Sequence, residues 1–355
     1  MTSMDTARPP PAIVRVRTTA PARGIPHPRA GPSERARQMP FTLSHPAAVL
    51  PLLRGPFVPA ALVAGAMAPD VPYFLRALGL AATNSRQWHE PFLNATQTHS
   101  PGGALTVTLP FAIALVAGYR LLRRPLNALL PAGYGLPGPA APSGAKERAI
   151  RAVWLLLSAL IGIATHQLWD AFTHHHGFLV ERVPLLRAPA VGGLSVARLV
   201  QYASTAAGLA LIGRHLWNHR GRLRSPGAAG GRLTPAVRWT VVAAIVLATA
   251  VGAAAHTRGG LDAHRHTTEV DYSRPIVRED DGFVDTSYPT RTVEAPWGTV
   301  AEGVLSDAAR GAGGAFTAGL ALYAALWWLR RAGAGAGRAP SAPEHALPPR
   351  TGQVR

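Results

Sequence analysis

The residues best suited to chemistry lie in one stretch near the middle of the chain, residues 163–174. His166, Asp170 and His174 recur there every four residues, at the end of a long apolar run. On a helix, this spacing places the three side chains along one face. Neutral imidazole and carboxylate oxygen are suitable ligands for zinc and related divalent cations. The spacing therefore predicts a metal site at the end of a membrane-spanning helix.

Two further ionisable residues, Asp70 and His99, interrupt or directly precede apolar segments. An ionisable group inside a membrane segment costs about 2.5–3.5 kcal/mol on insertion scales, so it is a functional candidate by default. Asp70 and His99 would complete a site of three or four ligands with His166 and Asp170. A catalytic metal keeps one position for water and lowers its pKa, and this metal-bound water would be the nucleophile.

The composition favours a membrane protein over a nucleic-acid-binding one. The chain has 355 residues, a net charge of +18 and a mean hydropathy of only +0.11, because apolar runs alternate with segments rich in Pro, Gly and Arg. A strongly basic balance is typical of nucleic-acid binders. Here, however, the arginines cluster in alternate loops between apolar runs, as in multi-span proteins. We therefore expect membrane lipids as partners and no nucleic acid.

Cysteine is absent from the chain, so thiolate metal sites and disulfides are excluded. A bound metal must use His, Asp, Glu or water. Zinc is the cation that we expect with such ligands.

Apolar runs near membrane length predict an all-α helical bundle of about six spans. The first span, within residues 44–80, contains Arg-Gly-Pro at 54–56 and Pro-Asp-Val-Pro at 69–72. These breaks predict a helical hairpin or a broken helix. In a hairpin, His45 and Asp70 would come to the same end. The remaining spans are expected at 103–122, 151–172, 196–217, 236–255 and 311–329.

The two ends of the chain differ from this central domain. Residues 1–38 are rich in Pro and Arg and lack apolar periodicity, so they are predicted to be a disordered extension, with Met39 as an alternative start. Residues 39–331 form the predicted membrane domain. It includes an extracytoplasmic loop, 257–308, which carries ten of the eighteen acidic residues. Residues 332–355 are predicted to be a disordered tail.

The distribution of positive charge predicts the orientation. Loops 123–150 and 218–235 are basic, and the last span ends at Arg330 and Arg331, so these parts and the C-terminus are expected in the cytoplasm. Loops 81–101, 173–195 and 257–308 would then lie outside. In this arrangement the candidate ligands all reach the outer ends of their helices, in a cell inner (plasma) membrane.

Each candidate also has a purely structural interpretation. His166 and Asp170 could form a hydrogen bond at a helix end, Asp70 could be a turn residue, and His99 could belong to a helix cap. We favour the ligand interpretation for His166 and Asp170, because Asp70 and His99 converge on the same side of the membrane. The structural and ligand interpretations of Asp70 and His99 remain evenly balanced.

Other polar residues give weaker signals. His174 is a candidate ligand, but it opens a His-His-His run that is typical of a solvated loop. Arg198, near the outer start of the fourth span, is a candidate contact for an anionic substrate, although such residues are more often interfacial anchors. An interfacial Trp-His pair explains His89 and Glu90. His264 and His266 receive no role.

The candidate residues lie in a recognisable pattern. Residues 39–52 read Met-Pro-Phe-Thr-Leu-Ser-His-Pro-Ala-Ala-Val-Leu-Pro-Leu, followed by Gly-Ala-Met-Ala-Pro-Asp at 65–70, Thr-His-Ser at 98–100 and His-Gln-Leu-Trp-Asp at 166–170. Over roughly residues 39–255 this pattern resembles an uncharacterised bacterial multi-pass membrane family, known only as a domain of unknown function. The order of motifs is also remotely similar to membrane-bound metal-dependent hydrolases of the bacterial inner membrane. That resemblance implies the metal ligands His45, Asp70, His99, His166 and Asp170.

Three functions are compatible with this reading. The first is a metal-dependent hydrolase that acts on a lipid-like or phosphoester substrate near the outer membrane face. The second is a transporter or ion-handling protein, because broken helices with Pro and Asp at depth are common in transporters. The absence of a convincing internal repeat counts against it. The third is a membrane scaffold without turnover, with loop 257–308 as its interaction element.

Overall fold

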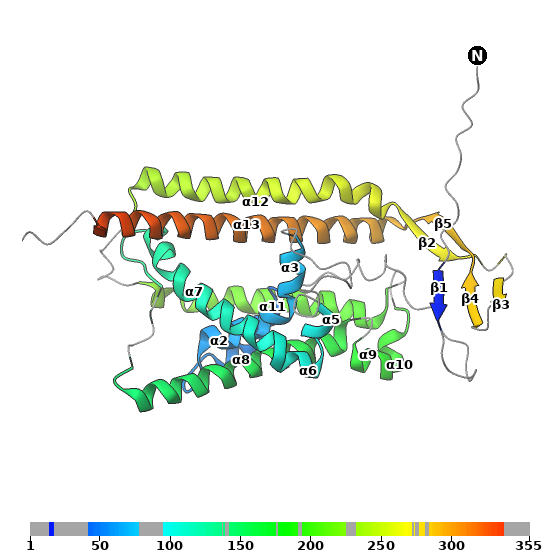
Figure 1. Ribbon diagram of the computed structural model, residues 1–355, viewed down its shortest axis with the longest axis horizontal. Coiled ribbons are helices and arrows are strands. Elements are labelled where there is room, and N and C mark those ends of the chain that lie inside the picture. The colour runs from blue at the N-terminus through cyan, green and yellow to red at the C-terminus, as the bar shows by residue number, and fades with distance from the viewer. Residues whose placement is uncertain are drawn as a thin grey trace, which may run out of the picture.

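The protein is an elongated bundle of helices with short strands at one end (Figure 1). The computed structural model describes residues 14–17, 42–77, 95–136, 138, 142–174, 177–190, 194–224, 232–271, 273, 277–280 and 284–336. The predicted tail 332–355 therefore lies outside the described residues from 337 onward, and so does most of the predicted extension 1–38.

Five helical segments of the described chain are long and apolar enough to cross a membrane, which fits a membrane-embedded protein and confirms the predicted all-α polytopic bundle. Three agree closely with predicted spans, whereas α12 and α13 are longer than predicted. The main helices are α7 (Leu109–Leu129), α8 (Ala145–Thr173), α11 (Val196–Asn218), α12 (Pro235–His264) and α13 (Trp297–Ala336). The segment of α7 begins earlier, with α6 (Pro101–Gly103) and the π-helical turn η3 (Ala104–Thr108).

The first predicted span is a broken helix. It consists of the 3-10 helix η1 (His45–Leu52), α2 (Pro59–Met67), the 3-10 turn η2 (Ala68–Asp70) and α3 (Val71–Ala77). Proline starts or interrupts these pieces, because it lacks the N–H that a continuous helix requires. None of the four pieces is among the helices long enough to span.

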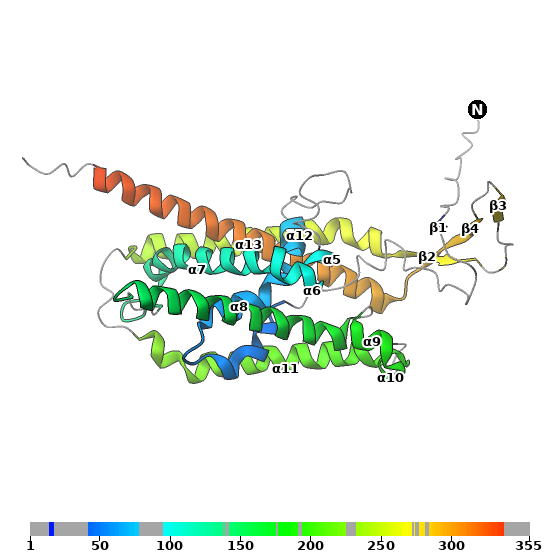
Figure 2. The ribbon, with the colours of Figure 1, turned by 60° about the horizontal axis from the view of Figure 1, so that its bottom comes forward.

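The short helix α2 lies between α7 and α8. Its buried alanines, such as Ala61 and Ala64, pack against Ala112 of α7 and against Ala159 and Ile163 of α8. The remaining short helices are α5 (Ala95–Thr98), α9 (Phe178–Arg182), α10 (Pro184–Arg187) and η4 (Arg220–Leu223). Figure 2 shows α8 and α11 side by side along the face opposite α12.

Two glycines allow α2 and α8 to approach backbone to backbone. A Cβ at Gly65 would lie 2.1 Å from the carbonyl oxygen of Ala159, and a Cβ at Gly162 would lie 2.3 Å from that of Leu62. Any larger residue would therefore push the two helices apart. This close approach brings the end of α2 against the His166 turn of α8.

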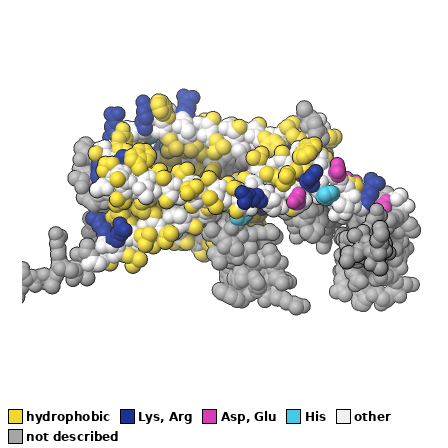
Figure 3. All heavy atoms as spheres, turned by 90° about the horizontal axis from the view of Figure 1, so that it is seen from above, with side chains coloured by type: hydrophobic (Ala, Val, Ile, Leu, Met, Phe, Trp, Pro, Cys, Tyr) yellow, Lys and Arg dark blue, Asp and Glu magenta, His cyan; other side chains and the backbone are white. Residues whose placement is uncertain are grey.

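The outer surface of the bundle is apolar. Large side chains such as Trp239, Leu247 and Leu322 are more than half exposed, and Figure 3 shows hydrophobic side chains covering most of the described surface on that face. In water a continuous apolar surface of this kind would promote aggregation, whereas in a membrane it would contact lipid chains. On the face in Figure 3, more of the Lys and Arg side chains lie toward the end of the bundle away from the strands than toward the strands.

Helices α12 and α13 extend well beyond the predicted spans. The predicted loop 257–308 is helical over residues 257–264 and 297–308, so it is shorter than the sequence indicates. Hydropathy detects only the apolar length of a helix, whereas here the helix pair continues through polar residues. A contact between His264 Nε2 and Asp307 Oδ2, 2.9 Å apart, joins these polar ends.

The part of this loop between the helices forms small sheets. Strand β2 (His266–Val270) pairs antiparallel with β5 (Thr290–Glu294). Strand β4 (Val284–Tyr288) pairs with β3 (Val277–Asp280) on one side and with β1 (Val14–Arg17) on the other. Four residues of the predicted disordered extension, Val14–Arg17, thus form a strand.

Candidate metal centre

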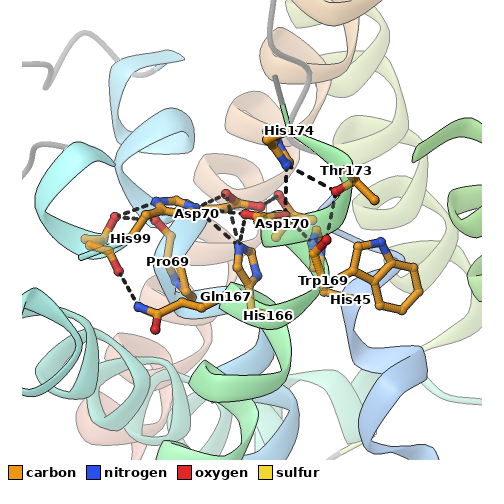
Figure 4. Close-up of polar contacts among 12 residues, drawn as sticks. His45, Pro69, Asp70, His99, His166, Gln167, Trp169, Asp170, Thr173 and His174 are labelled. Carbon is orange, nitrogen blue, oxygen red and sulfur yellow. Dashed lines mark hydrogen bonds and ion pairs between the residues drawn. The ribbon is translucent and has the colours of Figure 1, made fainter. Parts of the chain in front are cut away.

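The structure brings all five predicted ligands into one cluster inside the bundle, together with His174 (Figure 4). Four of the five are almost completely buried, and His99 is the more exposed one. They come from different elements, because η1, η2, the end of α5 and one face of α8 meet here. The cluster residues are His45, Asp70, His99, His166, Asp170 and His174.

Asp170 is at the centre of this cluster. Its Oδ1 lies 3.1 Å from His45 Nε2 and 3.1 Å from His174 Nδ1. Its Oδ2 lies 3.1 Å from His166 Nε2 and 3.2 Å from His99 Nε2. The predicted stripe on α8 is therefore real, since the one carboxylate reaches both of its histidine neighbours along the helix.

Asp70 approaches the same imidazoles from the other side. Its Oδ1 lies 3.5 Å from His99 Nε2 and 3.6 Å from His166 Nε2. Its Oδ2 accepts a 2.6 Å hydrogen bond from the Thr42 hydroxyl. Asp70 therefore belongs to a group of donors, with His99 and His166, that could hold a metal ion.

Backbone carbonyls fix the orientation of two imidazoles. His166 Nδ1 lies 2.8 Å from the carbonyl oxygen of Ala66, and His99 Nδ1 lies 2.8 Å from that of Ala95. A carbonyl oxygen only accepts, so both Nδ1 atoms carry hydrogen and donate. When these imidazoles are neutral, both Nε2 atoms face the cluster with a lone pair. A hydrogen bond from Nδ1 to a carbonyl is the usual outer support of a metal-ligating histidine.

The two Nε2 atoms of His99 and His166 lie 3.3 Å apart. Two lone pairs at this distance repel each other unless a proton or a cation shares the space with them. His45 lacks the outer support of the other two imidazoles, because its buried Nδ1 has no hydrogen-bond partner among the described residues, while its Nε2 faces Asp170. These donors thus fit a divalent cation. Without a cation or a proton between them, the facing Nε2 atoms of His99 and His166 cannot both be paired by hydrogen bonds.

A proton competes with the cation for this position. His99 precedes the first residue of the α6–α7 span. Burial lowers the pKa of its imidazole, but the Asp170 and Asp70 carboxylates outweigh burial and raise that pKa to about 10. A metal that binds here must displace the proton, so metal binding would release protons.

The Thr-His-Ser segment is held in place by its own hydroxyl groups. Thr98 is fully buried and donates a 2.6 Å hydrogen bond to the carbonyl of Pro69, next to Asp70. Ser100 caps α6 by accepting from the backbone N–H of Gly103. The helix-cap interpretation of this segment is therefore correct for Ser100, while the His99 side chain turns into the cluster.

Two geometric groups of donors are compatible with a metal ion. In one, the donor atoms of His45, His166 and Asp170 lie within 4.8 Å of one another, and in the other those of Asp70, His99 and His166 do. The buried His and Asp side chains could therefore hold a cation, and every residue in both groups was among the predicted ligands.

The candidate substrate contact, Arg198, is engaged by other residues. Its guanidinium donates to Gln201 Oε1 at 2.9 Å and forms an ion pair with Glu302 of α13. The anionic group that Arg198 binds is therefore the Glu302 carboxylate of the same chain. His89 and Glu90, as well as His175 and His176, lie outside the described residues.

Several residues that support the site were not predicted. Thr42 orients Asp70, Thr98 fixes the His99 segment, and the carbonyl of Ala66 orients His166. The ring of Trp169 lies 5.5 Å from that of His45. Only Thr42 and Thr98 carried a signal in the sequence, namely their places in the quoted motifs.

A comparison with protein families now identifies the chain more closely. Residues 39–279, more than half of the chain, match the domain of unknown function DUF4184. The chain belongs to this family. Comparison with curated proteins and with solved structures gives no match. All of the cluster residues lie within the DUF4184 segment, so the site is part of the family domain.

Proposed function

We propose that this DUF4184 protein is a membrane-embedded metal-dependent hydrolase that acts on a lipid-like or phosphoester substrate. The observation that carries the proposal is the convergence of carboxylate and imidazole donors from four chain segments. In particular, His99 and His166 turn their Nε2 atoms toward each other at 3.3 Å, with Asp170 Oδ2 within 3.2 Å of both.

The donor types indicate which metal and which chemistry. Nitrogen and oxygen donors without sulfur suit zinc among the common catalytic cations. When bound, such a cation lowers the pKa of water and polarises a phosphoryl or carbonyl oxygen. The ligands would be His45, Asp70, His99, His166 and Asp170.

The chain's own residues would place and support the reaction. Ala66 and Ala95 carbonyls hold two imidazoles in the tautomer that leaves Nε2 free. The Thr42 hydroxyl donates to Asp70 Oδ2 and keeps that carboxylate aimed at the cluster. The apolar walls of α2, α7 and α8 exclude water from the buried side. Access is therefore from the side of His99 and His174, whose side chains are 24% and 20% exposed.

The position of the cluster in the bundle suggests the substrate class. An apolar surface surrounds the helices, so a membrane lipid reaches this site more directly than a polar solute does. Positive charge at the opposite end of the bundle supports an inner-membrane location with the C-terminus in the cytoplasm and the cluster toward the outer face. Arg198 would bind a substrate phosphate only if its ion pair with Glu302 were broken.

One observation favours a different function. The chain breaks at η2, directly at Asp70, and discontinuous helices often form ion sites in transporters. An ion-handling protein would use the same donors to pass a cation without hydrolysing a substrate. Metal content alone would not separate the two functions, so the experiment must also measure turnover.

The test uses full-length protein purified in detergent. We expect bound zinc by elemental analysis, and hydrolysis of bis(p-nitrophenyl) phosphate or of phospholipid in mixed micelles. Both should be lost in a variant with His166→Ala and Asp170→Ala. The matched control, His264→Ala with Asp307→Ala, removes a His–Asp pair elsewhere and should retain both. Size-exclusion profiles establish that both variants are folded.

Two results would overturn the proposal. One is folded wild-type protein that binds no divalent cation. The other is protein that binds a cation and carries it across a liposome membrane but releases no product from either substrate, which would establish the ion-handling function instead.

A further inference from the structure

The two oxygens of Asp170 contact different pairs of histidines. Oδ1 faces His45 and His174, each at 3.1 Å, whereas Oδ2 faces His99 and His166 at 3.2 and 3.1 Å (Figure 4). A carboxylate that binds one cation through one oxygen accepts ordinary hydrogen bonds at the other. Here imidazole nitrogens approach both of its oxygens.

From this division we infer that the cluster holds two divalent cations, with one oxygen of Asp170 directed to each. The first position is formed by Asp170 Oδ2, His99, His166 and Asp70. The second is formed by Asp170 Oδ1, His45 and His174. The inference rests on the proposed function and deepens it, since paired cations are characteristic of enzymes that cleave phosphoesters.

His174 is the new ligand in this arrangement. It follows the last residue of α8, and its backbone N–H donates to the carbonyl of Asp170 at 3.0 Å, so the end of the helix fixes its position. Its Nδ1 also lies 3.3 Å from the Thr173 hydroxyl. The first residue of the His-His-His run thus belongs to the site, although the run as a whole is typical of a loop.

Each position combines buried ligands with one partly exposed histidine. Asp70 and His166 of the first position and His45 of the second have side chains at most 3% exposed. His99 of the first is 24% exposed and His174 of the second 20% exposed, so a substrate could reach both cations from the side of these two histidines. The first cation would have three ligand residues besides Asp170 and the second only two, so the first would be held more tightly.

The charges in the cluster point to the substrate. Among the described residues, two carboxylates, those of Asp70 and Asp170, contact the four histidines of the cluster, so they neutralise one divalent cation but not two. A second cation leaves uncompensated positive charge in a largely buried place, and this is costly without an anion. A phosphate group would supply the missing negative charge, so the two-cation site favours an anionic phosphoester over a neutral ester.

The test measures how many cations the full-length protein binds. Metal-free protein in detergent is dialysed against Mn²⁺ with and without inorganic phosphate, and bound Mn²⁺ is counted. We expect one tightly bound ion without phosphate and two with it. His174→Ala should bind one ion under both conditions, and the control His264→Ala should behave as wild type.

A spectroscopic measurement on the wild type avoids any dependence on the folding of variants. Two Mn²⁺ ions that share the Asp170 carboxylate are magnetically coupled, so the signal of the doubly loaded protein should differ from that of two isolated ions. A single bound ion in the wild type at all phosphate concentrations, or two uncoupled ions, would overturn the inference and leave the proposed function standing. Protein that binds no ion would overturn both.

Discussion

Two His–Asp pairs in this protein have similar distances but different surroundings. In the candidate metal centre, His166 Nε2 lies 3.1 Å from Asp170 Oδ2. The second pair, which we call the outer pair, joins α12 to α13, and its His264 Nε2 lies 2.9 Å from Asp307 Oδ2. At the outer pair, Arg310 forms an ion pair with the other carboxylate oxygen, Oδ1 of Asp307. Each oxygen of the Asp307 carboxylate therefore has one partner, an imidazole on Oδ2 and a guanidinium on Oδ1.

The difference lies in the number of imidazoles for each carboxylate. Four histidines surround Asp170, and two of them have Nδ1 committed to backbone carbonyls. One histidine faces Asp307, and an arginine supplies the second positive charge. A His–Asp distance of about 3 Å therefore does not by itself indicate a metal, whereas several imidazole nitrogens on one carboxylate form a group that could hold one.

The two pairs should differ most in how their variants respond to removal of metal. A chelator should lower the unfolding temperature of the wild type, because a ligand at 100 times its Kd contributes about 2.7 kcal/mol to stability. His264→Ala should show the same chelator-dependent shift, and His166→Ala should show none. Thermal unfolding in detergent measures this. An equal shift in all three proteins would mean that the chelator acts elsewhere than at the cluster.

A glycine in the helix contact behind each pair offers the next test. In Gly162→Ala the new Cβ meets backbone atoms of Leu62 and Ala66, so we expect a loss of roughly 1–3 kcal/mol and a lower metal content. In Gly303→Ala the three atoms nearest to the Cβ all belong to the ring of His264, a side chain that can rotate away. This variant should lose less stability and keep its metal.

The unfolding free energy and the bound metal of both glycine variants would be measured side by side. Gly118→Ala is a further control, because nothing lies within 4 Å of its Cβ. Loss of metal in Gly303→Ala, with the metal retained in Gly162→Ala, would contradict the assignment of the site to the α2–α8 contact.

The sequence predicted the residues of the cluster better than the groups that hold them in place. The four-residue spacing of His166 and Asp170 has one consequence on a helix, and polar residues in apolar segments have few other uses, so these residues could be found by pattern. The carbonyl of Ala66 carries no such signal, because every residue has one. Only the close approach at Gly65 and Gly162 places that carbonyl at His166.

The helix lengths show the same limit. The apolar part of α13 was predicted at 311–329, but its polar first turns are stabilised by contacts with α12, such as that of Asp307 with His264. At the start of α8, Glu147 accepts from the backbone N–H and hydroxyl of Ser143, so the helix begins before the predicted residue 151. A hydropathy profile detects neither kind of polar contact.

The support of Asp70 should have a smaller effect than the glycine contact. Thr42→Val keeps the shape of the side chain but removes the hydrogen bond to Asp70 Oδ2. Outer partners of ligands typically change metal affinity by about 10–100-fold, so we expect a loss of that order. The control is Thr249→Val, whose hydroxyl bonds only to the carbonyl of Ile245 in its own helix. Metal titration of both variants measures the difference, and unchanged affinity in Thr42→Val would argue against Asp70 as a ligand.

The outer pair itself should have the smallest effect. Asp307→Asn removes the charge that holds His264 and Arg310, but these groups are partly exposed, so we expect a loss of about 1 kcal/mol or less. Metal content should not change, because no other imidazole faces this carboxylate among the described residues. Unfolding in detergent and elemental analysis would test both points. A fall in metal content would mean that the α12–α13 pair shapes the centre at a distance, and the outer pair could then no longer serve as a neutral control.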